Sequence, residues 1–113
     1  MPFIDSKITV PVKPETKEEI KSELGEAISL LGKSERWLMI GIQDGYDLWM
    51  AGEKLERGVY AEVSLLGNAK SADYERLTAK ICDIYAEKLD IPPENIYVTY
   101  HPLDDWGWNG SNF

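Results

Sequence analysis

Residues 58–101, GVYAEVSLLGNAKSADYERLTAKICDIYAEKLDIPPENIYVTYH, determine the fold class of this chain. Apolar residues recur at every second position in residues 58–67, which predicts a strand. Residues 71–90 carry an apolar stripe at helical spacing, and IYVTYH at residues 96–101 predicts the next strand. The stripe consists of Leu77, Ile81, Ile84, Tyr85 and Leu89. A strand, a helix and a strand in this order form a βαβ unit, in which the two strands run parallel.

The first half of the chain has the same plan. FIDSKITVPV (residues 3–12) contains strand-like stretches, PETKEEIKSELGEAISLLG (residues 14–32) predicts a helix, and RWLMIGIQ (residues 36–43) predicts a short buried strand. The apolar stripe of this helix consists of Ile20, Leu24, Ala27, Ile28 and Leu31. The stripe and the strand after it recur at an offset of roughly 57 residues in the second half. We therefore predict two βαβ units and an α/β (α+β) fold class.

The ends of the predicted elements carry capping and turn signals. Thr16 and Glu19 have the spacing of a capping box at the start of the first helix, and Gly32 is placed to end it. Ser71 is expected to be the N-cap of the second helix. Residues 44–58 are rich in Gly and charge and predict a loop with room for a short hairpin.

Length and charge restrict the class of protein. The 113 residues are enough for one domain, residues 1–113, and 43% hydrophobic with 28% charged residues is typical of a soluble globular protein. The net charge is −8, whereas nucleic acids and anionic membranes are bound by clusters of Lys and Arg. We therefore expect neither a nucleic acid nor a membrane as a partner.

The sequence offers little for a metal, a disulfide or a targeting signal. Cys82 is the only cysteine and His101 the only histidine, so we expect no metal site and no cofactor. No apolar run approaches the roughly 20 residues that span a bilayer, and no basic-then-apolar leader begins the chain. The expected localisation is cytoplasmic, with non-classical secretion as the alternative.

The chain begins MPFI, with Pro2 directly after the initiator methionine. Methionine aminopeptidases remove Met1 when the second residue is small, and Pro2 would then carry a secondary amine in place of an amide nitrogen. An amine is a base and a nucleophile, whereas an amide is neither. The alternative is that Pro2 is only a site of N-terminal trimming.

Chain topology predicts which segments lie near Pro2. Pro2 begins the first strand and Lys33 leads into the strand parallel to it, so both are expected at one end of the sheet. The Leu66–Gly67 backbone joins them if the two βαβ units meet with opposite strand directions. The alternative makes Lys33 a solvated residue after a helix. Tyr97 and Thr99 lie near the start of the fourth strand, roughly 17–20 Å away along a strand, and reach a Pro2 only in a neighbouring chain.

Five pieces of the sequence together resemble one protein family. They are MPFI (1–4), Gly32-Lys33, SLLG (64–67), IPPENIYVTY (91–100) and WGWNGSNF (106–113). In this order and spacing they are similar to the family of macrophage migration inhibitory factor and D-dopachrome tautomerase, in the tautomerase superfamily. The resemblance covers the chain from end to end. It implies a four-stranded mixed sheet with two helices on one face, and a homotrimer whose three sheets enclose a central channel.

The resemblance also implies roles for single residues at subunit interfaces. Pro2 would be the catalytic base, and Lys33 would bind or polarise the carboxylate or enolate oxygen of the substrate. The backbone N–H of Leu66 would be a second anchor for the substrate. Tyr97 would come from the adjacent chain.

Several positions depart from the family's pattern or extend it. Thr99 stands where Asn is common in the family, and keeps a hydroxyl but loses the amide. Trp106 stands where Val is common, which favours the stacking of an aromatic substrate. Trp37, Trp108 and Phe113 are expected to supply an apolar wall.

These residues predict a keto–enol tautomerase. Burial and Lys33⁺ would both lower the pKa of the Pro2 amine, which would then be an unprotonated base near neutral pH. The expected substrates are keto or enol acids of the arylpyruvate type, phenylpyruvate and hydroxyphenylpyruvate, with dopachrome as a further candidate. The alternative is a cytokine-like, protein-binding trimer with a vestigial pocket and a protein receptor. Arg36, near Lys33 in sequence, is expected to be a surface residue.

Overall fold

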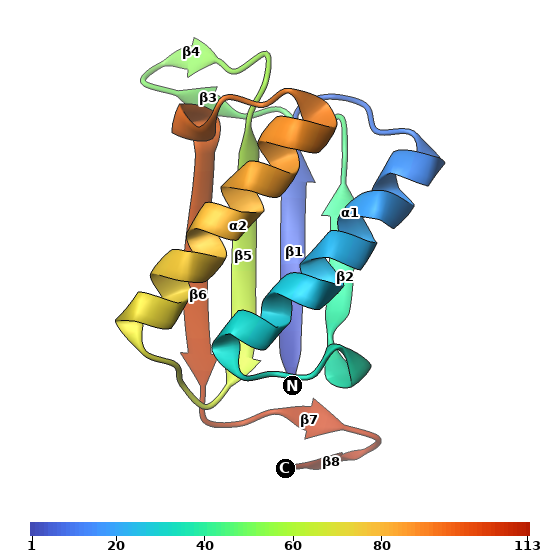
Figure 1. The fold of residues 1–113 in the computed structure, drawn as a ribbon, viewed down its shortest axis with the longest axis vertical. Helices are drawn as coiled ribbons and strands as arrows, with labels where there is room; N and C mark the ends of the chain where they lie inside the picture. Colours follow the sequence, from blue (N-terminus) through green and yellow to red (C-terminus); the bar gives the residue numbers. More distant parts are fainter.

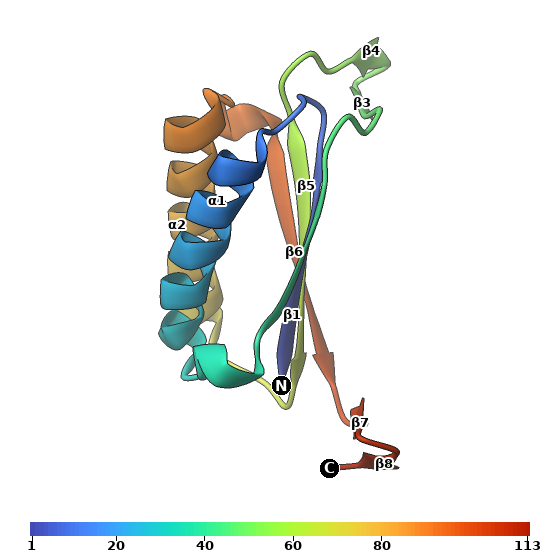
Figure 2. The same cartoon turned by 90° about the vertical axis from the view of Figure 1, so that its right-hand side faces the viewer.

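A four-stranded mixed sheet with two helices on one face makes up most of the molecule, which a computed structural model describes over residues 1–113 (Figures 1 and 2). In chain order these elements are β1 (Pro2–Ile8), α1 (Pro14–Ala27), β2 (Met39–Gln43), β5 (Val59–Leu66), α2 (Ser71–Leu89) and β6 (Ile96–Leu103). Two small hairpins extend from opposite ends of the sheet (Figure 1). They are β3 (Trp49–Met50) with β4 (Glu53–Lys54), and β7 (Gly107–Trp108) with β8 (Ser111–Asn112).

The strand order β2-β1-β5-β6 confirms the two predicted βαβ units. β1 and β2 are parallel, as are β5 and β6, because each helix carries the chain back to the start of the preceding strand. The two units meet through β1 and β5, which are antiparallel. The end of β5 therefore lies beside the start of β1.

The core lies between the sheet and the two helices. Alternate residues of β1 and β5 point into this layer, in agreement with the period of two in the sequence. The two predicted helical stripes face them, and apart from Leu89, which is partly exposed, all of their members are buried. One polar side chain, Ser6, is buried in this layer, and its Oγ accepts a hydrogen bond of 2.6 Å from the Tyr85 hydroxyl. Neither helix combines the length and the apolar character that crossing a membrane requires.

The predicted N-caps of both helices are wrong. α1 begins at Pro14, so Thr16 lies inside the first turn and forms no capping box with Glu19. Proline at the first helical position has a fixed φ that suits the helix and lacks the N–H that would need a cap. α2 begins at Ser71 itself, and Lys70 occupies the N-cap position.

The segment between α1 and β2 consists of two tight turns. A 3₁₀ turn (Ile28–Leu31) continues α1 and ends at Gly32, as predicted, with φ +71° in the left-handed region that favours glycine. A second 3₁₀ turn (Glu35–Trp37) follows. The Arg36 N–H donates a hydrogen bond of 3.1 Å to the Oγ of Ser34, which caps this turn.

β2 is shorter and more exposed than the buried strand predicted over residues 36–43. It begins only at Met39, because the residues before it form the second turn. β2 pairs with β1 alone and is an edge strand, so the Met39 side chain remains 69% exposed. An apolar run of this length does not distinguish a central strand from an edge strand.

The sheet face opposite the helices is uncovered in the isolated chain (Figure 2). Lys7 forms ion pairs on this face with Asp5 at 3.2 Å and Glu62 at 3.3 Å, and His101 Nε2 lies 3.7 Å from a Glu62 oxygen. This face therefore carries charged side chains near its middle, together with exposed apolar residues such as Met39 and Leu103.

Candidate active site

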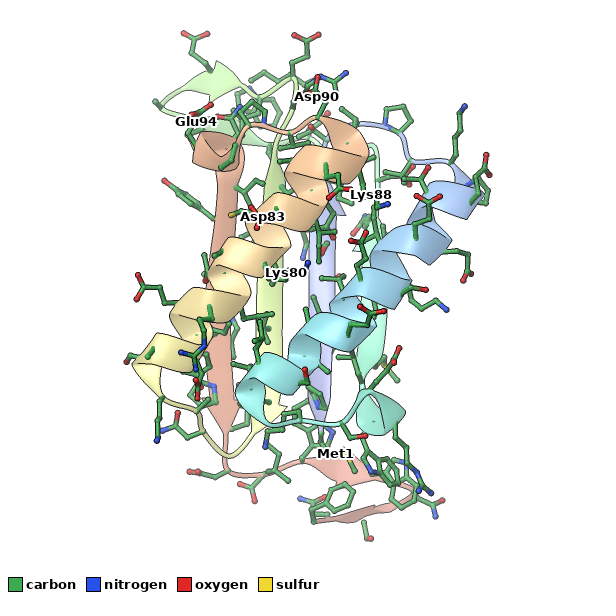
Figure 3. The ribbon with its side chains drawn as sticks, in the orientation of Figure 1. Met1, Lys80, Asp83, Lys88, Asp90 and Glu94 are labelled. Atoms are coloured by element: carbon green, nitrogen blue, oxygen red, sulfur yellow. The ribbon has the colours of Figure 1, made fainter.

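The start of β1 and the end of β5 meet at one end of the sheet. Pro2 is buried and pairs with Leu65, and the carbonyl oxygen of Met1 accepts a hydrogen bond of 2.9 Å from the Leu66 N–H. Met1 therefore extends the pairing of β1 with β5 by one residue. Figure 3 places Met1 at this end of the sheet, above the C-terminal hairpin.

Lys33 reaches the same end of the sheet from the turn after α1. Its Nζ donates a hydrogen bond of 3.0 Å to the carbonyl oxygen of Leu66. A Cβ atom built on Gly67 would lie 4.0 Å from this Nζ. The predicted convergence of Pro2, Lys33 and the Leu66–Gly67 backbone is therefore confirmed.

A pocket with a volume of about 790 Å³ opens beside Pro2. Strand ends, the second turn after α1 and the C-terminal segment all contribute to it. Its lining consists of Met1, Pro2, Phe3, Arg36, Trp37, Leu38, Met39, Ser64, Leu103, Asp105, Trp106, Gly107 and Trp108. Most of these side chains are apolar, so the pocket suits a ligand with a hydrophobic body.

Aromatic side chains form one wall of this pocket. Trp37 and Trp108 pack edge to face with ring centroids 5.3 Å apart. Phe113 stacks on Trp108 at 5.8 Å, and Trp106 completes the aromatic lining. Trp108 of the C-terminal segment thus packs within its own chain, and it still remains 51% exposed.

Five predicted site residues do not line the pocket. They are Lys33, Leu66, Tyr97, Thr99 and Phe113. Lys33 and Leu66 are hydrogen bonded to each other at the same end of the sheet, and Phe113 contacts the pocket lining through Trp108.

Tyr97 and Thr99 lie on β6 away from the pocket of their own chain, as predicted. Tyr97 pairs across the sheet with Tyr60, close to the end of β5 opposite Leu66, and is 63% exposed. The Thr99 hydroxyl lies 3.0 Å from the Tyr60 hydroxyl and 3.0 Å from His101 Nε2. This hydroxyl therefore already has two partners within its own chain.

The pocket also contains residues that the sequence analysis did not single out. Phe3 and Ser64 are direct partners in the β1–β5 register and extend from the face opposite the core. Their place could have been found by continuing the period of two from the buried residues. Arg36, which is exposed as expected, and Asp105 also line the pocket. Their positions depend on the two turns that bring these residues together, which periodicity does not predict.

The pocket environment disfavours a protonated amine at its inner end. Burial is the larger cause, and the positive charge of Lys33 the second, of a lowered pKa for the Met1 amino group. Both effects stabilise the neutral amine, which is the basic form.

Known proteins match the chain along its whole length. The family model of macrophage migration inhibitory factor (MIF) matches residues 1–113. The MIF of Meriones unguiculatus is 25% identical over 118 residues, which cover 100% of this chain and 99% of that protein. The crystal structure of Leishmania major MIF2 has 26% identity and a TM-score of 0.93, over 100% of this chain and 97% of that chain.

The same fold occurs in a more distant structure, described as a Q0 fused 4-OT wild type symmetric trimer. It has a TM-score of 0.84 at 16% identity, over 96% of this chain and 93% of that chain. The family match over all residues, together with the two MIF relatives, identifies the chain. It belongs to the macrophage migration inhibitory factor family, within the tautomerase superfamily.

Proposed function

We propose that this chain is a keto–enol tautomerase of arylpyruvates, with the amine of Pro2 as the general base once Met1 has been removed. Membership of the family supports a MIF-like tautomerase or cytokine-like function. The observation that carries the tautomerase proposal is the position of Pro2, which is buried, lines the pocket and lies at the sheet end that Lys33 reaches.

The proposed reaction moves one proton from carbon to oxygen. The Pro2 nitrogen takes a proton from the carbon next to the carbonyl group, and the electrons of that C–H bond form the C=C bond of an enolate. Lys33 stabilises the negative charge on the oxygen, because its ammonium group has three donors and Leu66 uses only one. The protonated Pro2 then returns this proton to the oxygen, which gives the enol and regenerates the neutral amine, and the reverse sequence returns the ketone.

The electrostatics of the site support this role of Pro2. The two effects that lower the pKa of the Met1 amine, burial and the charge of Lys33, would also act on a Pro2 amine one residue further into the sheet. A larger fraction of the amine is then neutral near pH 7. A neutral amine is the form that accepts a proton.

The lining of the pocket supports aryl-substituted substrates. Trp37, Trp106 and Trp108 offer aromatic faces and edges to a planar ring. Phenylpyruvate and hydroxyphenylpyruvate combine such a ring with the acidic C–H bond that the reaction requires. Dopachrome, which also has a planar ring system, is a further candidate.

We also propose a homotrimer in which adjacent chains complete each site. The fused 4-OT structure that shares the fold is described as a trimer. Both edges of this chain's sheet are unpaired, and Tyr97 is 63% exposed at the sheet end opposite the pocket. A neighbouring chain that pairs with these edges would bring its Tyr97, and with it Thr99, to a pocket that these residues do not reach in their own chain.

The test is the tautomerisation of phenylpyruvate, hydroxyphenylpyruvate and pyruvate by protein whose intact mass shows that Met1 is absent. We expect turnover of both aryl substrates, less turnover of pyruvate, and a loss of about 100-fold or more in Pro2→Gly. Full activity of Pro2→Gly would exclude the proline mechanism. No turnover by either protein, with a protein partner bound equally by both, would favour the cytokine-like alternative.

A further inference from the structure

The positively charged side chain that lines the pocket belongs to Arg36 and not to Lys33. Among the lining residues only Arg36 and Asp105 have charged side chains. Lys33 does not line the pocket, and its Nζ donates to the Leu66 carbonyl oxygen at 3.0 Å. Two cations are therefore available at this end of the sheet, and only Arg36 lines the pocket.

Arg36 has no partner for its charge. It forms no ion pair with any carboxylate, including that of Asp105, and its side chain donates no hydrogen bond within the chain. Its guanidinium carbon lies 5.2 Å from the centroid of the Trp37 ring, which is the range of a cation–π contact. A stacked guanidinium keeps its N–H groups free for an acceptor at its edge.

The backbone at Arg36 is held in place by its turn. The Arg36 N–H donates to Ser34 Oγ at 3.1 Å, and Trp37 N–H donates to the Ser34 carbonyl oxygen at 3.3 Å. The side chain therefore extends from a fixed point at the pocket wall. A guanidinium that is already positioned loses less conformational entropy when it binds a ligand.

We propose that Arg36 binds the carboxylate of the substrate and selects 2-oxo acids over neutral ketones. This inference rests on the proposed function, and it assigns a different role to each of the two cations. Arg36 holds the carboxylate through paired N–H donors, a geometry that a planar guanidinium provides and an ammonium does not. Lys33 is left to stabilise the oxygen that becomes the enolate.

The charge of the chain opposes the binding of an anionic substrate. The net charge is −8, and one of its acidic residues, Asp105, lines the pocket. A cation in the pocket lining offsets this repulsion locally.

The experiment compares phenylpyruvate with its neutral methyl ester in wild type, Arg36→Gln and Arg36→Lys. We expect Arg36→Gln to lower kcat/KM for the acid by about 10- to 100-fold, mainly through KM, and to leave kcat/KM for the ester unchanged. Arg36→Lys should recover part of the loss, because the charge is retained without the planar fork. Lys80→Gln is the matched control, since Lys80 is exposed on α2 and its replacement changes the net charge equally (Figure 3).

Other outcomes would overturn the inference. An equal loss for the acid and the ester would give Arg36 a structural role only. An unchanged ratio of the two kcat/KM values in Arg36→Gln, or the same change in Lys80→Gln, would exclude a specific carboxylate site.

A binding measurement separates this inference from the proposed function. If wild type turns over neither substrate, the proposed function is refuted. The affinities for 3-phenylpropanoate and its amide, measured by tryptophan fluorescence, then show whether Arg36 still forms a carboxylate site. Weaker binding of the acid alone in Arg36→Gln supports the carboxylate site. Equal affinity of both proteins for the acid, or no binding by wild type, contradicts it.

Discussion

Met1 controls two groups of the proposed site, the nitrogen of Pro2 and the backbone N–H of Leu66. The peptide bond of Met1 keeps the Pro2 nitrogen an amide, and the Met1 carbonyl oxygen accepts the hydrogen bond of the Leu66 N–H at 2.9 Å. That N–H is also the proposed second anchor for the substrate. Removal of one residue would therefore create the base and release a hydrogen-bond donor at the same time.

Lys33 is expected to set the pH dependence of the reaction. The positive charge of Lys33 lowers the pKa of an amine at this end of the sheet, so Lys33→Met should raise the pKa of the Pro2 amine. A base with a higher pKa stays protonated, and therefore inactive, up to a higher pH. The acidic limb of the plot of kcat/KM against pH then moves to higher pH. A pH profile with phenylpyruvate measures this shift, together with a lower plateau from the loss of enolate stabilisation.

Lys33→Arg is the control for the effect of charge. It keeps the positive charge, so its acidic limb should remain near that of wild type even if its plateau falls. A Lys33→Met limb that coincides with the wild-type limb would mean that Lys33 does not act on the base.

At the scale of elements, β1 and α2 are connected by one buried hydrogen bond. The Tyr85 hydroxyl donates to Ser6 Oγ at 2.6 Å, and burial raises the pKa of Tyr85 to about 12, so the hydroxyl keeps its proton at neutral pH. Tyr85→Phe leaves the Ser6 hydroxyl buried without this partner and should lower the free energy of unfolding by about 1–3 kcal/mol. Equilibrium urea unfolding at a fixed protein concentration measures the change.

The double variant Ser6→Ala/Tyr85→Phe tests the cause of that loss. Removing both partners leaves no unsatisfied buried group, so we expect the double variant to be more stable than Tyr85→Phe alone. Strictly additive losses from the two single variants would show that the hydrogen bond does not connect these elements energetically.

The elements that periodicity describes were predicted from the sequence, whereas the helix starts and the second 3₁₀ turn were not. The stripes of α1 and α2 and the alternation of β5 result from burial on one face, which requires apolar residues at a regular spacing in the sequence. The start of α1 at Pro14 and the 3₁₀ turn at Glu35–Trp37 depend on local backbone geometry instead. The C-terminal hairpin of β7 and β8 was missed for the same reason.

In the candidate site, too, the positions set by strand pairing were predicted, and the positions set by turns and side-chain packing were not. Parallel and antiparallel pairing predicted that Pro2, Lys33 and Leu66 converge, because strand direction alone places them at one sheet end. Arg36 is exposed, as predicted, but its place in the pocket lining depends on the second turn and was not predicted. Tertiary packing of Trp37 against Trp108 then forms the aromatic wall, and no spacing in the sequence specifies that contact.

At the scale of the whole molecule, the isolated chain does not bring every proposed site residue together. Pro2 and Tyr97 lie toward opposite ends of the sheet, so a site that contains both requires two chains. Mixed trimers of Pro2→Gly and Tyr97→Ala test this directly. Each variant alone should have low activity, whereas refolding an equal mixture should restore about one quarter of the wild-type sites by random assembly.

The control for that experiment is the mass of the assembly in solution. Recovery of activity in a trimeric mixture supports a site shared between chains. A trimeric mixture without recovery would place Tyr97 outside the functional site, and a monomeric protein with full activity would refute the shared site altogether.

The central proposal, that the free amine of Pro2 is the catalytic base, is tested most directly with two forms of one sequence. One form has lost Met1 and the other retains it, as verified by intact mass, and every side chain after position 1 is identical. We expect kcat/KM for phenylpyruvate to be at least about 100-fold higher for the form that begins at Pro2, because only in that form is the nitrogen of Pro2 an amine and therefore basic. Equal activity of the two forms would contradict the proposal and require another residue as the base.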